Sequence, residues 1–137
     1  DLITVGGGTA CQYVAEQPVD ENFFLSMQGR DTYKQAVRSM VNVCSAILNR
    51  NNLGIDDVDL FVPHQANMRI IEAVGARLEI AGDRVFTNVS EYGNTSAASI
   101  PLALTEARAQ GRVKNGSRVL VTAFGSGLTW GAALLDF

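Results

Sequence analysis

Short apolar runs alternate with amphipathic segments along the chain, and this alternation restricts the fold more than any other feature. The order strand, helix, strand, helix, strand, helix, strand, strand predicts a layered α/β domain with a mostly parallel sheet. Gly125-Ser126-Gly127 joins the last two strands, which predicts a terminal antiparallel hairpin. We expect strands at 2–5, 58–62, 85–89, 118–124 and 129–137, and helices at about 31–50, 67–78 and 97–110.

Punctuating residues set the expected boundaries of these elements. Asp31 is placed to cap the first helix, and Pro63 is expected to end its strand because it has no N–H for a ladder. Gly111 is the expected stop of the third helix. Residues 9–25 follow neither a helical nor a strand period, so we expect an irregular segment there.

Composition limits the class of protein. With 137 residues, 47% of them apolar, the chain can bury a core without disulfides, so we expect a single domain over residues 1–137. Cys11 and Cys44 lack CxxC spacing, and with one histidine they cannot build a zinc site; we expect reduced thiols in a cytoplasmic protein. No apolar run approaches the ~18 residues of a membrane span, and no signal peptide is visible.

The formal net charge of −3 argues against nucleic acid as a partner. The charge is unevenly distributed, however. Residues 1–24 hold four acidic residues and no basic one, whereas residues 25–137 hold eleven basic and ten acidic residues. The second part can therefore carry a modest basic surface.

Three turns carry unusual chemistry, and each follows or precedes an expected element. The only histidine, His64, lies between a strand and a helix, beside the side-chain amides of Gln65 and Asn67. Amides next to an apolar strand lower the stability of the fold unless they form hydrogen bonds within the protein or bind a ligand. A structural histidine is the alternative. Asn94 lies in a loop where Gly93 permits a positive φ and Thr95 or Ser96 can cap the next helix.

The third turn, residues 124–128, places glycines around Ser126. Such a turn can aim a backbone N–H at an oxyanion, although a tight hairpin alone also explains it. A G-x-S-x-G nucleophile elbow does not fit, because no glycine stands two residues before Ser126. Ligands in α/β sheets bind beyond the carboxyl ends of strands, so these three turns are the expected site.

The motifs His-Gln-Ala-Asn at 64–67, Gly-Asn-Thr-Ser-Ala-Ala-Ser-Ile-Pro at 93–101 and Phe-Gly-Ser-Gly-Leu-Thr-Trp-Gly at 124–131 resemble β-ketoacyl-acyl carrier protein synthase III of the thiolase superfamily. The resemblance implies a thiolase-like fold of two similar halves, of which this chain looks like the C-terminal one. The chain begins at Asp1 rather than Met, and we expect an absent N-terminal half that carries the nucleophilic cysteine. Neither Cys11 nor Cys44 matches that cysteine.

The resemblance also implies the reaction. A primer acyl group passes from coenzyme A to the missing cysteine, malonyl-acyl carrier protein loses CO2, and the enolate attacks the acyl-enzyme, which initiates fatty acid synthesis. His64 and Asn94 match the catalytic histidine and asparagine, which donate hydrogen bonds to the enolate oxygen. Phe124 matches the residue beside the malonyl carboxylate, and Gly125 and Ser126 form the oxyanion turn.

The remaining implied positions bind substrates and partners. Met27, Gly29, Ala66 and Asn67 match the tunnel for the pantetheine arm of coenzyme A. Lys34, Arg69 and Arg77 match or lie near basic positions that meet the acyl carrier protein; an ordinary solvated helix face is the alternative.

No metal or cofactor beyond the thioester substrates is implied, and a homodimer is expected of the full-length protein, without nucleic acid or membrane partners. The open alternatives are a non-catalytic domain that docks carrier proteins, and another condensing enzyme of the superfamily, such as one of polyketide synthesis.

Overall fold

The computed structural model describes residues 3–5 and 25–137 of the chain. By their contacts the residues belong to two compact units, Asp1–Gln35 and Ala36–Phe137, and each unit is described by itself. The irregular segment expected at 9–25 lies outside the described residues up to residue 24, and so does Cys11.

The first unit contains a two-stranded antiparallel sheet of β1 (Ile3–Val5) and β2 (Leu25–Met27), in which Ile3 pairs with Met27. The strand expected at 2–5 is therefore present, but it pairs with β2 and not with the strands near residues 60 and 120. The strand β2 was not expected. Its three residues are too few to show a period of two, and the paired residues are 20 to 24 positions apart in the sequence.

Helix α1 (Gly29–Arg50) begins two residues before the expected start. Its first turn closes with a hydrogen bond of 2.9 Å from the N–H of Thr32 to the carbonyl of Gln28. The prediction that Asp31 caps the helix is wrong, because Asp31 lies inside the first turn, where its charge favours the helix dipole. From Ala36 onward the apolar stripe of the helix is buried, at Ala36, Val37, Met40, Cys44 and Leu48.

The second unit is built on a mixed sheet in the order β3 (Leu60–Pro63), β4 (Arg118–Gly125), β5 (Thr129–Asp136). Strands β3 and β4 are parallel, and strands β4 and β5 are antiparallel and pair down to Gly125 and Thr129. The predicted terminal hairpin is confirmed. Pro63 is the last residue of β3, as expected from its missing N–H.

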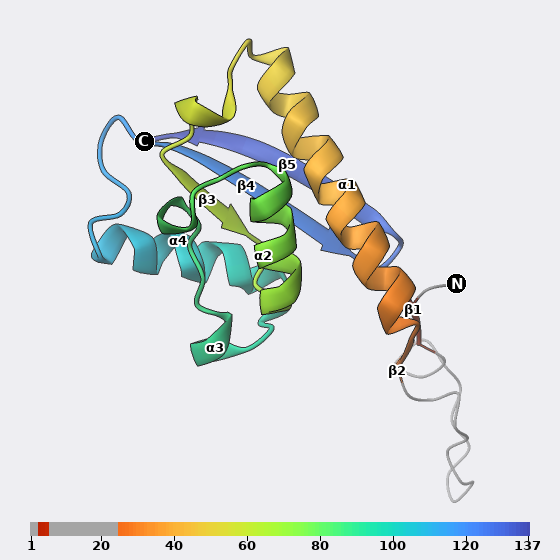
Figure 1. Ribbon diagram of the computed structural model, residues 1–137. Coiled ribbons are helices and arrows are strands. Elements are labelled where there is room, and N and C mark those ends of the chain that lie inside the picture. The colour runs from red at the N-terminus through yellow and green to blue at the C-terminus, as the bar shows by residue number, and fades with distance from the viewer. Residues whose placement is uncertain (1–2, 6–24) are drawn as a thin grey trace, which may run out of the picture. The chain divides into compact units, whose positions relative to one another are not determined.

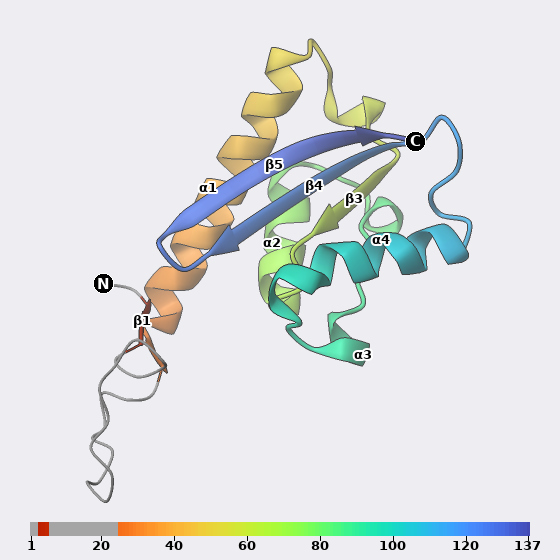
Figure 2. The same ribbon diagram turned by 180° about the vertical axis from the view of Figure 1, so that it is seen from behind.

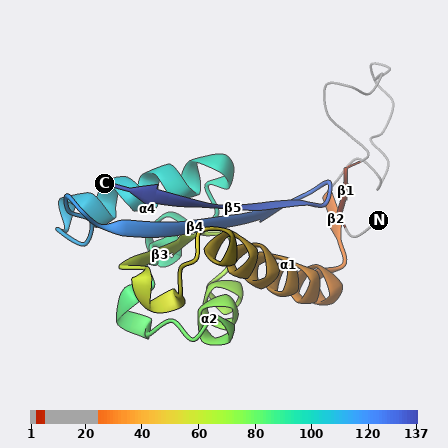
Figure 3. The same ribbon diagram turned by 90° about the horizontal axis from the view of Figure 1, so that it is seen from above.

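Helices cover both faces of this sheet, as Figures 1 and 2 show from opposite sides. Figure 3 places α4 (Ser99–Ala109) on one face, and α2 (Met68–Arg77) together with the later part of α1 on the other. The core on the α4 face consists of Leu60, Val62, Phe86, Ala103, Ala107, Val113 and Val119. The layered α/β architecture predicted from the alternation is therefore confirmed.

The strand expected at 85–89 is reduced to one parallel bridge between Val85 and Phe61. The N–H of Phe86 donates to the carbonyl of Phe61 at 2.9 Å, but the next ladder position is taken by the side chain of Gln65. Its Oε1 accepts from the N–H of Asn88 at 2.9 Å, and its Nε2 donates to the carbonyls of Pro63 and Phe86 at 2.7 and 3.2 Å. A side-chain amide thus replaces the missing rung.

Shorter helical pieces complete the second unit: 3-10 turns η2 (Ile55–Asp57), η3 (Gly82–Arg84) and η4 (Ser96–Ala98), and the one-turn helix α3 (Val89–Tyr92). The expected third helix, 97–110, is the combination of η4 and α4, and Gly111 ends it with a φ of 70°. Among residues 3–5 and 25–137, no helix is both long and apolar enough to cross a bilayer.

Candidate active site

Strands β3 and β4 are parallel neighbours, so their carboxyl ends point the same way; Pro63, the last residue of β3, pairs with Thr122, and β4 continues for three more residues to Gly125. The turns that follow them, residues 64–67 and 125–128, therefore both lie beyond carboxyl ends of the sheet, with the second turn three residues further along β4 than the first. The segment 94–98 directly precedes Ser99, the first residue of α4, whose Oγ contacts His64. The structure thus joins the turn after β3 to the start of α4 through the contact of His64 with Ser99.

His64 is held on both sides of its backbone. Its N–H donates to the carbonyl of Thr122 on β4 at 2.8 Å, and its carbonyl accepts from the N–H of Ala66 at 3.0 Å. The ring atom Nδ1 lies 2.5 Å from Oγ of Ser99, and no partner of Nε2 is found among the described residues. Partial burial lowers the pKa of His64 from its ordinary 6.5, so the imidazole is neutral at pH 7.

Gln65 is 1% exposed and fully bonded. Beside the three side-chain bonds described above, its N–H donates to Oγ of Ser99 at 3.2 Å. The sequence marked this amide as costly unless bonded, and the structure satisfies it. Among the described residues, no buried side-chain nitrogen or oxygen lacks a hydrogen bond.

The next two residues lead into α2. Ala66 is half-buried, and Asn67 is exposed and caps the helix: its Oδ1 accepts from the N–H of Arg69 at 2.9 Å. This bond satisfies one of the N–H groups that a helix start leaves open. The structure therefore gives Asn67 a local structural task, whatever it binds.

Asn94 follows Gly93, whose φ of 66° is the positive value that the sequence allowed for. The Oδ1 of Asn94 accepts from the N–H of Ser96 at 2.9 Å, Asn94 is exposed, and no partner of its Nδ2 is found among the described residues. Thr95 holds the N-cap position of η4, as expected, but its side chain makes no capping bond. The amide of Asn94 organises this turn instead.

In the hairpin turn, the groups available to a ligand are mainly those of the backbone. The ring of Phe124 is 9% exposed and stacks on Trp130, its partner across the hairpin, with centroids 6.3 Å apart and planes 14° apart. Gly125, Ser126 and Gly127 are exposed, and the carbonyl of Ser126 accepts from Oγ1 of Thr129 at 3.3 Å. This bond orients the peptide after Ser126.

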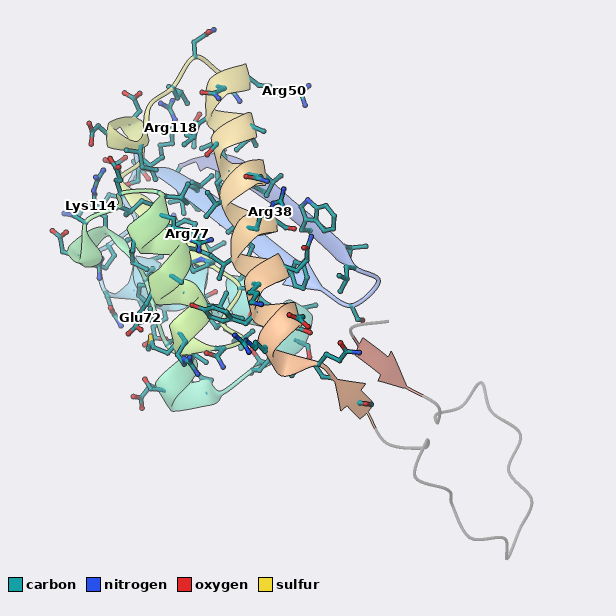
Figure 4. The ribbon with its side chains drawn as sticks, turned by 45° about the vertical axis from the view of Figure 1, so that its right-hand side comes forward. Arg38, Arg50, Glu72, Arg77, Lys114 and Arg118 are labelled. Atoms are coloured by element: carbon teal, nitrogen blue, oxygen red, sulfur yellow. The ribbon has the colours of Figure 1, made fainter. Side chains whose placement is uncertain are left out.

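The basic positions are exposed, as their expected role requires. Arg69 and Arg77 lie on α2, and their spacing of eight residues corresponds to about 12 Å along the helix. Arg77 also lines a hollow of about 230 Å³ with the end of α1 and Glu79; Figure 4 shows its position on α2. In the other unit, Lys34 is exposed and pairs with Asp31 at 3.4 Å.

Two expected binding positions also lie in the first unit. Met27 on β2 is 54% exposed, and Gly29 opens α1 with open space around its Cα.

The one described cysteine is unsuited to attack a thioester. Cys44 is fully buried, and this burial raises the pKa of its thiol to about 11 despite a hydrogen bond with Thr122. At neutral pH the group is a protonated, inaccessible thiol. Among residues 3–5 and 25–137 there is no cluster of three or more His, Cys, Asp or Glu side chains that can hold a metal ion.

Sequence reasoning missed Ser99 and Thr122 as neighbours of His64. Ser99 is the last of five small residues, 95–99, and its contact with His64 is a close approach between segments distant in the sequence. Nothing in the spacing indicated which hydroxyl meets the imidazole, because the two residues are 35 positions apart.

The chain is similar to known proteins in both sequence and fold. The model of the family "3-oxoacyl-[acyl-carrier-protein (ACP)] synthase III C terminal" matches residues 48–137. β-Ketoacyl-[acyl-carrier-protein] synthase III of Nitratidesulfovibrio vulgaris (strain DP4) is 62% identical over 137 residues, which is all of this chain and 42% of the relative. The chain therefore spans less than half the length of such relatives.

Solved structures give the same result. The synthase III of Thermus thermophilus is 44% identical with a TM-score of 0.84, over 96% of this chain and 40% of that one. The Aquifex aeolicus VF5 synthase III is 50% identical with a TM-score of 0.83, over 86% of this chain and 38% of that one. These similarities confirm the thiolase-like fold expected from the three motifs.

Proposed function

The chain belongs to the 3-oxoacyl-[acyl-carrier-protein] synthase III family, and on that premise we propose that it forms part of a condensing enzyme. The proposed reaction is the decarboxylative Claisen condensation of an acyl-coenzyme A primer with malonyl-acyl carrier protein, which initiates fatty acid synthesis. Residues 1–137 act in it as the C-terminal domain. The substrates are thioesters, and no metal or further cofactor takes part.

The observation that carries this proposal is the orientation of two hydrogen-bond donors. Nδ1 of His64 is engaged by Ser99, which leaves Nε2 for a ligand, and Oδ1 of Asn94 is engaged by Ser96, which leaves Nδ2. When the bond to the malonyl carboxylate breaks, its electron pair moves onto the thioester carbonyl and CO2 leaves. Two fixed donors at that oxygen stabilise the enolate, each by roughly 3–4 kcal/mol.

Residues of the hairpin turn interact with the two other negative charges of the reaction, the oxyanion of acyl transfer and the malonyl carboxylate. The N–H of Ser126, between Gly125 and Gly127, is one donor to the oxyanion of the acyl-transfer steps. The apolar ring of Phe124, held by its stacking on Trp130, lies beside the malonyl carboxylate and disfavours its charged form, which promotes loss of CO2.

The nucleophile comes from outside the described residues. Cys44 is excluded by its burial and by its raised pKa, so a cysteine of the enzyme's N-terminal half carries the acyl group. The chain's partners are that half and, in the full-length enzyme, a second copy in a homodimer. The complete enzyme works in the cytoplasm, without membrane or nucleic-acid partners.

Substrate binding involves the remaining positions. Met27, Gly29, Ala66 and Asn67 line the path of the pantetheine arm. The exposed cations of Lys34, Arg69 and Arg77 meet the acyl carrier protein, for which a basic surface is suited because the carrier is acidic.

A chimeric enzyme tests the proposed reaction. In it, residues 1–137 replace the matching 42% of the Nitratidesulfovibrio vulgaris synthase III, which supplies the rest of the protein. We expect the chimera to form ketoacyl-carrier protein from acyl-coenzyme A and malonyl-carrier protein. A folded chimera that binds coenzyme A but neither decarboxylates malonyl-carrier protein nor condenses would contradict the proposal.

Charge reversal tests the docking surface in the same chimera. Arg69→Glu and Arg77→Glu should each weaken binding of the carrier protein, whereas Arg50→Glu, a matched change at the end of α1, should not (Figure 4). Isothermal titration with malonyl-carrier protein, against malonyl-coenzyme A as the small thioester, measures the difference. Equal affinities for all three variants would remove α2 from the docking surface.

A further inference from the structure

Ser99 is the first residue of α4, and only 2% of it is exposed. Its Oγ lies 2.5 Å from Nδ1 of His64 and 3.2 Å from the backbone N of Gln65. A buried hydroxyl therefore stands between the proposed catalytic ring and the peptide that follows it. Three polar groups share one small space, so the positions of their hydrogens are coupled.

The number of hydrogens on these three groups determines which group donates and which accepts. The N–H of Gln65 can only donate, so Oγ of Ser99 accepts from it. The hydroxyl has one hydrogen of its own, and among the described residues Nδ1 of His64 is the acceptor found for it. If Nδ1 carried a hydrogen instead, Oγ would accept two bonds and its own hydrogen would have no partner, which is costly in a buried place.

From this arrangement we infer that Ser99 is a positioning residue that holds the His64 ring as the neutral tautomer with its hydrogen on Nε2. The inference rests on the proposed role of His64 as a donor to the enolate oxygen. In the opposite tautomer, Nε2 would present a lone pair to that oxygen and repel it. Ser99 thus acts on the reaction through His64 and does not touch the substrate.

Two further observations support a fixed ring. The backbone of His64 is tied to Thr122, and Gln65 is locked by its own side-chain bonds, so the peptide that donates to Ser99 cannot rotate. Burial also lowers the pKa of His64, which favours the neutral ring, and only the neutral ring has two alternative tautomers.

The single histidine allows a direct test on the 137-residue chain. In a long-range ¹H–¹⁵N correlation spectrum of the ¹⁵N-labelled chain at pH 8, the two ring nitrogens of His64 are told apart by their couplings to the ring C–H protons. We expect the protonated-type shift at Nε2 and the lone-pair shift at Nδ1. The reverse assignment in the wild-type chain would overturn the inference without any variant.

Variants then assign the effect to the hydroxyl. Ser99→Ala should shift the tautomer ratio toward the Nδ1–H form by about fivefold, the effect of one neutral hydrogen bond. Ser99→Thr keeps a hydroxyl and should restore the wild-type pattern. Thr105→Ala is the matched control, because Thr105 lies on the same helix and its hydroxyl bonds only to the carbonyl of Pro101. An unchanged ratio in Ser99→Ala would refute the role of Ser99.

A kinetic readout connects the tautomer to the reaction. In the chimeric enzyme, Ser99→Ala should lower kcat for decarboxylation of malonyl-carrier protein by about fivefold with little change in KM, and Ser99→Thr should recover it. A change confined to KM would contradict a positioning role. If the chimera has no condensing activity at all, the proposed function fails, but the spectrum of the chain still decides the tautomer.

Discussion

The turn after β3 and the turn after β4 follow parallel neighbouring strands, yet they are built in opposite ways. In the first, Gln65 is 1% exposed and His64 is tied through both its backbone and Nδ1. In the second, Gly125, Ser126 and Gly127 are exposed, and the side chains contribute little.

This difference shows two ways to place a hydrogen-bond donor. A side-chain donor such as Nε2–H of His64 must be oriented by partners on its other atoms, which requires burial and a complete set of bonds. A backbone N–H needs no such support, because the hairpin itself sets its direction. Four predictions test that contrast, from the largest expected effect to the smallest.

The largest effect is expected from removing the side-chain donors in the chimeric enzyme. His64→Ala and Asn94→Ala should each lower kcat for malonyl decarboxylation by about 10²–10³-fold, because each loses a donor to the enolate oxygen. Stopped-flow detection of released CO2 measures the rate. Transfer of the acyl group onto the enzyme serves as the control for folding; decarboxylation within threefold of the wild-type rate would exclude the altered residue as a donor.

Truncating Gln65 should mainly affect stability. Gln65→Ala leaves the carbonyls of Pro63 and Phe86 and the N–H of Asn88 without their buried partner. At about 1–3 kcal/mol for a buried group left unpaired, the free energy of unfolding should fall by about 3 kcal/mol or more. Urea unfolding of the chain measures it, with the exposed Gln110→Ala as control. A loss no larger than the control's would show that this network is dispensable.

The pH dependence of stability should carry a smaller contribution from His64. Its folded pKa lies below 6.5, so between the two values the unfolded chain binds more protons at this residue. The free energy of unfolding is therefore reduced as the pH falls below about 6.5, and it recovers as the pH rises through that value. Urea unfolding of wild type and His64→Gln between pH 5 and 8 isolates the contribution. Parallel curves would mean that the folded pKa is not lowered.

The smallest effect is expected at the hairpin turn. Ser126→Ala removes a hydroxyl but keeps the N–H that is proposed to act, so kcat of the chimera should stay within about twofold and stability within about 0.5 kcal/mol. Steady-state condensation assays and urea unfolding check both. A tenfold loss of kcat would show that the hydroxyl, and not the backbone, serves the reaction, and the contrast between the two turns would then disappear.

Local patterns predicted most of the second unit. The helical period around 67–78, the proline at 63 and the glycines in the final turn each act over a few residues, and α2, β3 and the hairpin formed as expected. The strand expected at 85–89 did not form beyond one bridge. Its apolar pattern correctly indicated burial, but the side chain of Gln65 takes the hydrogen bond of Asn88 that a neighbouring strand would otherwise take. Such competition between a side chain and a strand has no local signal.

The sequence by itself determined the layered α/β class, the terminal hairpin and the motifs that identify the family, because these depend on spacing between near neighbours. Only the tertiary structure decided the pairing of β1 with β2, the buried bonds of Gln65 and the contact of Ser99 with His64. These features join residues that are distant in sequence, and a hydrogen bond between such residues exists only where packing brings a donor and an acceptor within about 3 Å.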